Sequence, residues 1–173
     1  LTGGWHDAGD YNKYVNFAWG TLIDLLLAYE ENPLIWGDDY NIPESGNGIP
    51  DLLDEIKYEL SWLRKMQQTD GSVLSIVGGG AASPPSSDQN FRVYGPATTS
   101  ASFTAAGVFA LASIQFASIG QTFDAFYYKN AALAAYDWAV ANPGITFYNS
   151  GLLGAGEQET DSYGVAARKF TAS

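Results

Sequence analysis

The sequence has no cysteine among its 173 residues, and this absence removes several kinds of chemistry at once. Without thiols the chain has no disulfide, no thiolate nucleophile and no thiolate metal site. It also has a single histidine, His6, so a Ser-His-Asp arrangement would have to use that residue. A zinc site would need mostly carboxylates beside it. Both kinds of site are therefore disfavoured.

Basic residues are also scarce. Eight Lys and Arg face 19 Asp and Glu, which gives a formal net charge of -11. A nucleic-acid backbone would be repelled over most of such a surface, whereas a neutral substrate would not. Aromatic residues make up 14% of the chain, and sugars stack on aromatic rings. The composition therefore favours a carbohydrate ligand and disfavours nucleic acid.

Long hydrophobic runs are missing as well. The leucine-rich run around residues 25–28 is far too short to cross a bilayer, so we expect no membrane partner. No signal peptide is recognisable. Because the chain starts abruptly and stops inside a helical pattern, we expect it to be a fragment of a longer protein. The missing signal peptide then says nothing about the compartment.

Apolar residues recur at helical spacing in five stretches, which predicts an all-α chain. The predicted helices cover about 14–30, 50–66, 99–117 and 124–142, and a fifth starts near 161. Asp124 is the expected N-cap of the fourth helix. Strand signals are weak, at 72–77 and 91–94. The rhythm of helix, long loop and helix is typical of helical hairpins arranged in a barrel or solenoid.

Several other side chains have expected environments. The carboxylates at the start of the second helix, Asp51, Asp54 and Glu55, and the others on that helix are expected to form a solvated face that complements the helix dipole. Tryptophans at helical core spacing are expected to pack in the core; these are Trp19, Trp62 and Trp138. Trp36 and Tyr40 lie in a loop and are better candidates than these tryptophans for facing a substrate, a role that is about as compatible with their position as a purely structural one. Residues 78–97, rich in Gly, Ser and Pro, form a long loop of a kind that is often functional.

The most informative segment lies before the first helix, where Asp7 and Asp10 are separated by Ala8 and Gly9. The small residues allow a tight turn and leave space for a ligand or a water. Both carboxylates could converge on one water, one taking its proton and the other orienting it, as inverting glycosidases require opposite a separate general acid. Spacing alone leaves three interpretations open: helix caps, calcium ligands or catalytic carboxylates.

Residues 3–10, Gly-Gly-Trp-His-Asp-Ala-Gly-Asp, resemble the Gly-Gly-Trp-Tyr/His-Asp-Ala-Gly-Asp signature of glycoside hydrolase family 9. The resemblance continues through Lys13-Tyr14, residues 41–55 and residues 59–67, and more weakly to residues 166–167. Residues 41–67 are similar to the branch whose catalytic domain follows an immunoglobulin-like module. The resemblance implies an (α/α)6 barrel, of which residues 1–173 would be about the first half. It also implies hydrolysis of β-1,4-glucosidic bonds with inversion and no organic cofactor.

The resemblance also implies roles for individual residues. Asp10 would be the general base and Asp7 would help to hold the water, while Trp5 and His6 would shape the adjoining wall. The implied protein is a secreted, endo-acting enzyme on cellulose or a related β-1,4-glucan, with an immunoglobulin-like or carbohydrate-binding module as a further expectation. An exo-acting relative (cellobiohydrolase or glucosaminidase) and a non-catalytic calcium- or carbohydrate-binding helical domain remain alternatives.

Two features of the family pattern are missing from this sequence. The general acid, a glutamate near the end of the catalytic domain, and a late substrate loop with histidine and arginine have no counterpart here, and Glu157 and Glu159 are not assigned that role. Glu159 and Asp161 are candidates for a structural calcium site, with solvated charges at a helix start as the alternative. Phe147 and Tyr148 occupy positions where relatives present sugar-stacking aromatics, and core packing is equally compatible with them.

Overall fold

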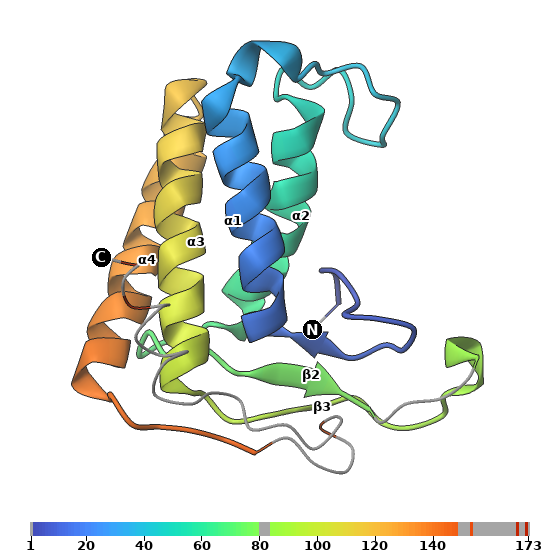
Figure 1. Cartoon of the computed structure of the whole chain (residues 1–173), viewed down its shortest axis with the longest axis vertical. Coiled ribbons are helices and arrows are strands. Elements are labelled where there is room, and N and C mark those ends of the chain that lie inside the picture. The colour runs from blue at the N-terminus through green and yellow to red at the C-terminus, as the bar shows by residue number, and fades with distance from the viewer. Residues whose placement is uncertain (1, 80–83, 149–152, 154–168, 170–171, 173) are drawn as a thin grey trace.

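The computed structural model describes residues 2–79, 84–148, 153, 169 and 172, and it shows four long helices standing on a small sheet (Figure 1). The helices are α1 (Val15–Glu31), α2 (Asp51–Met66), α3 (Thr99–Ser118) and α4 (Thr122–Ala141). Two short 3-10 helices, η1 (Pro33–Ile35) and η2 (Pro85–Ser87), lie in the connections. The four predicted helices agree with the observed ones to within two residues at each end. The fifth, from residue 161, lies outside the described residues.

The sheet lies at the end of the bundle where α1 begins (Figure 1). Its antiparallel strands are β1 (Lys13–Tyr14), β2 (Ile76–Gly78) and β3 (Val93–Tyr94), in that order. Val77 of β2 pairs with Lys13 on one side and with Tyr94 on the other. The sheet therefore joins the segment that carries Asp7 and Asp10 to the loop that precedes α3.

The core is formed by apolar side chains from all four helices. Helix α3 is buried on almost every side, between α1 and α4. With 20 residues and a mean hydropathy of 1.4, it is long and apolar enough to cross a membrane, but 72% of that window is buried inside the molecule, as in the central helix of a globular core. Trp62 is a core residue as predicted, Trp19 packs partly buried against the core, and Trp138 is half-buried outside it.

One predicted cap was wrong. Helix α4 begins at Thr122, so the N-cap position belongs to Gln121 and Asp124 lies inside the first turn. Its carboxylate accepts a hydrogen bond from Lys57 Nζ of α2 at 2.5 Å. Asp124 therefore joins two helices and does not cap one.

Candidate active site

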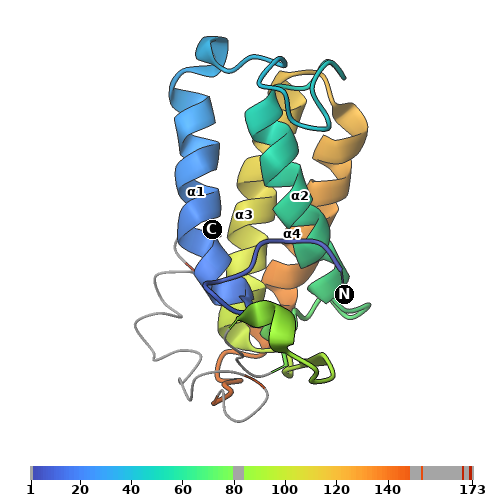
Figure 2. The same cartoon turned by 90° about the vertical axis from the view of Figure 1, so that its right-hand side faces the viewer.

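The N-terminal segment crosses in front of α2 (Figure 2). Gly3 and Gly4 have φ angles of 89° and 74°, in the left-handed region that disfavours side chains. A Cβ on Gly4 would also lie 2.6 Å from Trp62 Cγ and 2.9 Å from Glu59 Oε2. The two glycines therefore bring the backbone into direct contact with α2, immediately before the candidate catalytic loop.

Two glutamates of α2 hold Trp5 against the helix. Glu59 Oε2 accepts the backbone N–H of Trp5 at 2.5 Å, and Glu55 Oε1 accepts its indole N–H at 2.6 Å. Glu59 is only 1% exposed, and this burial raises the pKa of its carboxyl to about 7, although the Trp5 hydrogen bond and the charge of Lys13 act in the opposite direction. Glu59 was not a predicted site residue.

The predicted solvated face of α2 was wrong for three of its carboxylates. Asp51, Asp54 and Glu59 are 2%, 7% and 1% exposed, whereas Glu55 is exposed as expected. Helical periodicity places these residues away from the core stripe, but it does not reveal that loops cover that face. The N-terminal segment covers Glu59, and residues 38–47 cover the other two.

Asp10 is oriented by a neighbour in its own loop. Both of its carboxylate oxygens accept hydrogen bonds from Asn12, from the backbone N–H at 2.8 Å and from Nδ2 at 3.0 Å. Asn12 is 2% exposed, and its Oδ1 accepts the N–H of Gly79 at 3.1 Å, which fixes the orientation of its amide. The N–H of Asp7 donates to the carbonyl of Asn12 at 3.0 Å and closes the loop. The structure thus presents Asp10 in a defined direction.

The capping interpretation of the two aspartates does not apply to α1. Tyr14 occupies the N-cap position without a side-chain cap, and the N–H of Val15 donates to the carbonyl of Ser75 at 3.0 Å. Asp7 lines a hollow of about 160 Å³ together with Trp5, His6 and Glu59. Trp5 and His6 therefore line the same hollow as Asp7.

A larger hollow of about 490 Å³ is also lined by His6. Its wall includes Tyr11, whose ring centroid is 5.0 Å from that of His6, and Arg92, whose guanidinium carbon is 5.1 Å from the Tyr11 centroid. Thr2, Lys13 and Tyr94 also line this hollow. Burial, Lys13 and Arg92 lower the pKa of His6, while the charge of the nearby Asp10 acts in the opposite direction.

The sequence did not identify Tyr11 or Arg92 as site residues. Arg92 lies 81 positions after Tyr11 in the sequence. It reaches Tyr11 because β2 pairs with β1 on one side and with β3 on the other, which brings the segments next to β1 and β3 together. The available signal was that residues 78–97 form a long loop of a kind that is often functional. Gly79 in that loop leaves room for the arginine, since a Cβ there would lie 2.6 Å from Arg92 Nη1.

The later predicted residues are less closely tied to this site. Phe147 is half-buried, and its ring would lie 3.4 Å from a Cβ on Gly95, directly after β3. Tyr148 is 58% exposed. Neither is among the described residues that line the two hollows. Glu159 and Asp161 lie outside the described residues.

The loop aromatics lie at the other end of the bundle, where α1 ends and α2 begins (Figure 1). Trp36 packs partly buried against the core, with its indole N–H 3.4 Å from the carbonyl of Ala28. Tyr40 is 52% exposed, and its hydroxyl donates to the carbonyl of Ile35 at 2.9 Å. The structure therefore does not bring these two residues to the aspartate loop.

Comparison with known proteins agrees with the motif. The family described as Glycosyl hydrolase family 9 matches residues 1–168. Endoglucanase D of Acetivibrio thermocellus is 36% identical over 170 residues, which cover 93% of this chain and 27% of that protein. A xyloglucan-specific endo-beta-1,4-glucanase of Bacteroides ovatus is 37% identical over 164 residues, which cover 87% of this chain and 27% of that protein.

The fold agrees as well. The crystal structure of a metagenome-derived glycoside hydrolase family 9 endoglucanase superposes with a TM-score of 0.86 at 35% identity, covering 98% of this chain and 31% of that one. This likeness confirms the predicted all-α fold of the (α/α)6 barrel type. The chain spans less than a third of the length of each of these three relatives.

Proposed function

This chain belongs to glycosyl hydrolase family 9, and we propose that the protein hydrolyses β-1,4-glucosidic bonds in cellulose or a related β-glucan. The observation that carries the proposal is the loop of Asp7 and Asp10. Asp10 is held through both carboxylate oxygens by Asn12, and Asp7, three residues earlier, lines a hollow together with Trp5 and His6. The endoglucanase relatives support the β-glucan substrate, and this part of the protein supplies one side of the reaction.

In the proposed mechanism Asp10 takes a proton from a water molecule while that water attacks the anomeric carbon. Asp7 holds the same water through a hydrogen bond. The glycosidic C–O bond breaks on the opposite face of the sugar, and the leaving oxygen receives a proton from a separate general acid, so the configuration inverts. The family resemblance implies that this acid is a glutamate of the later part of the catalytic domain.

Glu59 has a pKa typical of a general acid, but its position fits a supporting role. Its Oε2 already accepts the N–H of Trp5, and its side chain is buried between the N-terminal segment and α2. Glu59 therefore fixes the approach to the aspartate loop, and the proton for the leaving group comes from elsewhere.

Endo action is the proposed mode, supported by relatives whose names describe endoglucanases, one of them specific for xyloglucan. The open wall of His6, Tyr11 and Arg92 suits an extended neutral chain, because rings and a guanidinium plane offer stacking surfaces without needing a charged ligand. Secretion, and an immunoglobulin-like or carbohydrate-binding module, belong to the same proposal, since polymeric β-glucan is met outside the cell.

The test is Asp10→Asn in the full-length protein, assayed on soluble β-glucan. Removal of a general base lowers kcat by about 10²–10⁴-fold. Asp24→Asn, an exposed aspartate of α1, is the matched control and should leave turnover unchanged. Near-normal turnover of Asp10→Asn would refute the assignment.

Product analysis in the same assay separates the modes of action. A rapid fall in viscosity with few new reducing ends supports endo cleavage, and release of uniform short products supports the exo alternative. Binding of β-glucan by the wild-type protein without bond cleavage would instead support the non-catalytic helical domain.

A further inference from the structure

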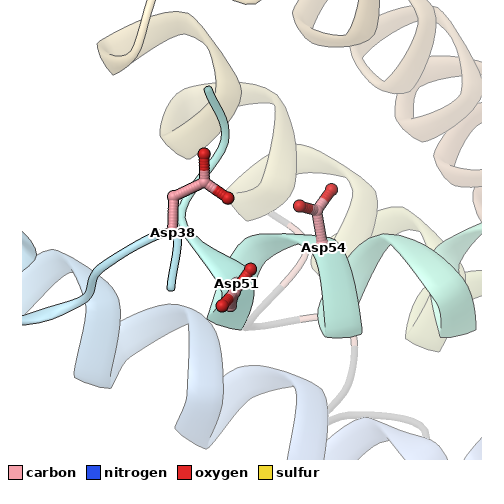
Figure 3. A group of neighbouring side chains, drawn as sticks. All are labelled: Asp38, Asp51 and Asp54. Carbon is pink, nitrogen blue, oxygen red and sulfur yellow. The ribbon is translucent and has the colours of Figure 1, made fainter. Parts of the chain in front are cut away.

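A second acidic cluster lies at the start of α2, at the end of the bundle away from the sheet (Figure 3). Asp38 comes from the loop after η1, and Asp51 and Asp54 lie in the first turn of the helix. Each offers a carboxylate oxygen, and these three oxygens all lie within 4.8 Å of one another. Asp51 and Asp54 are buried and Asp38 is half-buried.

The loop before α2 is folded around these carboxylates. Asp38 accepts two backbone N–H bonds, and Asp51 and Asp54 accept bonds from the loop through Oδ2. The donors are Gly46 N–H and Gly48 N–H to Asp38 (both 2.6 Å), Tyr40 N–H (2.6 Å) and Ser45 Oγ (2.8 Å) to Asp51, and Asn47 Nδ2 (3.0 Å) to Asp54. The positions of the carboxylates are therefore built by the fold.

One oxygen of the cluster is left unsatisfied. Asp51 Oδ1 is buried and has no hydrogen-bond partner among the described residues, although a buried carboxylate oxygen without a partner carries a desolvation cost. Three carboxylates at this spacing also repel one another, and no ion pair of the described residues involves them. Lys57, the nearby cation of α2, is engaged with Asp124. A bound cation would supply both the missing partner and the missing charge.

We propose that Asp38, Asp51 and Asp54 bind a hard divalent cation, for which calcium is the fitting ion. Calcium takes six to eight oxygen ligands at about 2.3–2.6 Å, so two oxygens bound to the same ion lie at most about 5 Å apart, as these do. An all-carboxylate set without nitrogen or sulfur does not favour zinc. Water and other loop oxygens complete the coordination.

The structural consequence is a clamp on the start of α2. The cation joins the loop, through Asp38, to the first helical turn, through Asp51 and Asp54. The next residue, Glu55, holds the indole of Trp5. The site is separate from the aspartate loop, so its test does not depend on the hydrolytic mechanism.

The test counts calcium ions bound by the full-length protein after removal of metal with a chelator, using calorimetric titration with calcium chloride. Asp38→Asn and Asp54→Asn each remove a ligand from a different segment. Asp39→Asn, an exposed neighbour in the same loop, is the matched control. We expect both ligand variants to bind one calcium ion fewer than the wild type and Asp39→Asn, and to lose the calcium-induced rise in Tm that the site contributes.

Comparison between variants is required because another calcium site elsewhere in the protein would change the total but not the difference. Far-ultraviolet circular dichroism checks that each variant is folded, and the two ligand variants provide independent readouts. Equal calcium counts in Asp38→Asn, Asp54→Asn and Asp39→Asn would overturn the proposal. Zinc binding at this site without calcium binding would overturn the choice of a hard cation.

Discussion

The buried carboxyl of Glu59 makes the stability of this protein depend on pH in a way that one substitution isolates. Its pKa rises from 4.5 to about 7 on folding, because burial disfavours the charged form. The native state therefore binds this proton more tightly than the unfolded state does. The stabilisation is complete below pH 4.5 and is lost as the pH rises through 7. A shift of this size corresponds to about 3 kcal/mol.

Glu59→Gln removes the titration and keeps an oxygen that can accept the N–H of Trp5. The free energy of unfolding of the variant, minus that of the wild type, should increase by about 3 kcal/mol between pH 4 and pH 8. Urea unfolding at a series of pH values, followed by tryptophan fluorescence, measures this difference. The other ionisable groups titrate in both proteins, so their contributions cancel in the difference between the two free energies of unfolding.

Two further variants define what the result means. Glu31→Gln changes an exposed carboxylate at the end of α1 and should keep the wild-type slope. Glu59→Leu removes the acceptor, leaving the N–H of Trp5 without its partner, which costs about 1–3 kcal/mol throughout the pH range. If Glu59→Gln and wild type give parallel curves, Glu59 does not change its proton affinity on folding and the reasoning is wrong.

Two other substitutions test the path and the orientation of the aspartate loop. Gly4→Ala should lower the free energy of unfolding by at least about 1–2 kcal/mol because of the left-handed φ angle alone, and the contact of the new Cβ with Trp62 adds to this cost. Gly20 lies in open space on α1, so the control Gly20→Ala should instead raise the free energy of unfolding by about 0.5–1 kcal/mol in the same urea titration. Asn12→Ala should lower kcat by about 10–100-fold with a smaller change in KM, because Asp10 loses its orienting side-chain donor; an unchanged kcat would show that Asn12 does not position the base.

The helices could be predicted closely because their signals are local. The apolar stripe from Val15 to Leu26 repeats at helical spacing, and Pro33 and Pro50 interrupt the chain on either side of the loop. The strands contain two or three residues each, too few for an alternating pattern to emerge. Tyr14 therefore falls at the start of the predicted helix, although its backbone pairs with Ile76 of β2.

The site could be predicted only where its contacts are close in sequence. Asp7 and Asp10 share a loop with the residue that orients one of them, so their motif contains most of that geometry. Glu59 and Arg92 reach the loop from far along the chain, through the packing of α2 and the order of the sheet. The periodicity of a single segment does not predict these long-range contacts, because they depend on how elements far apart in the sequence pack together.

Helix α2 connects the two acidic regions of the molecule. Its first turn carries Asp51 and Asp54, and Glu59 follows Asp54 by five residues, a rise of about 7.5 Å along the axis. Glu55, between them, holds the indole of Trp5, while Glu59 holds its backbone. Glu55, adjacent in sequence to Asp54, is thus the point where the proposed cation site comes nearest along α2 to a contact of Trp5. Glu59, which is only 1% exposed, holds the backbone of the same residue from a more deeply buried position.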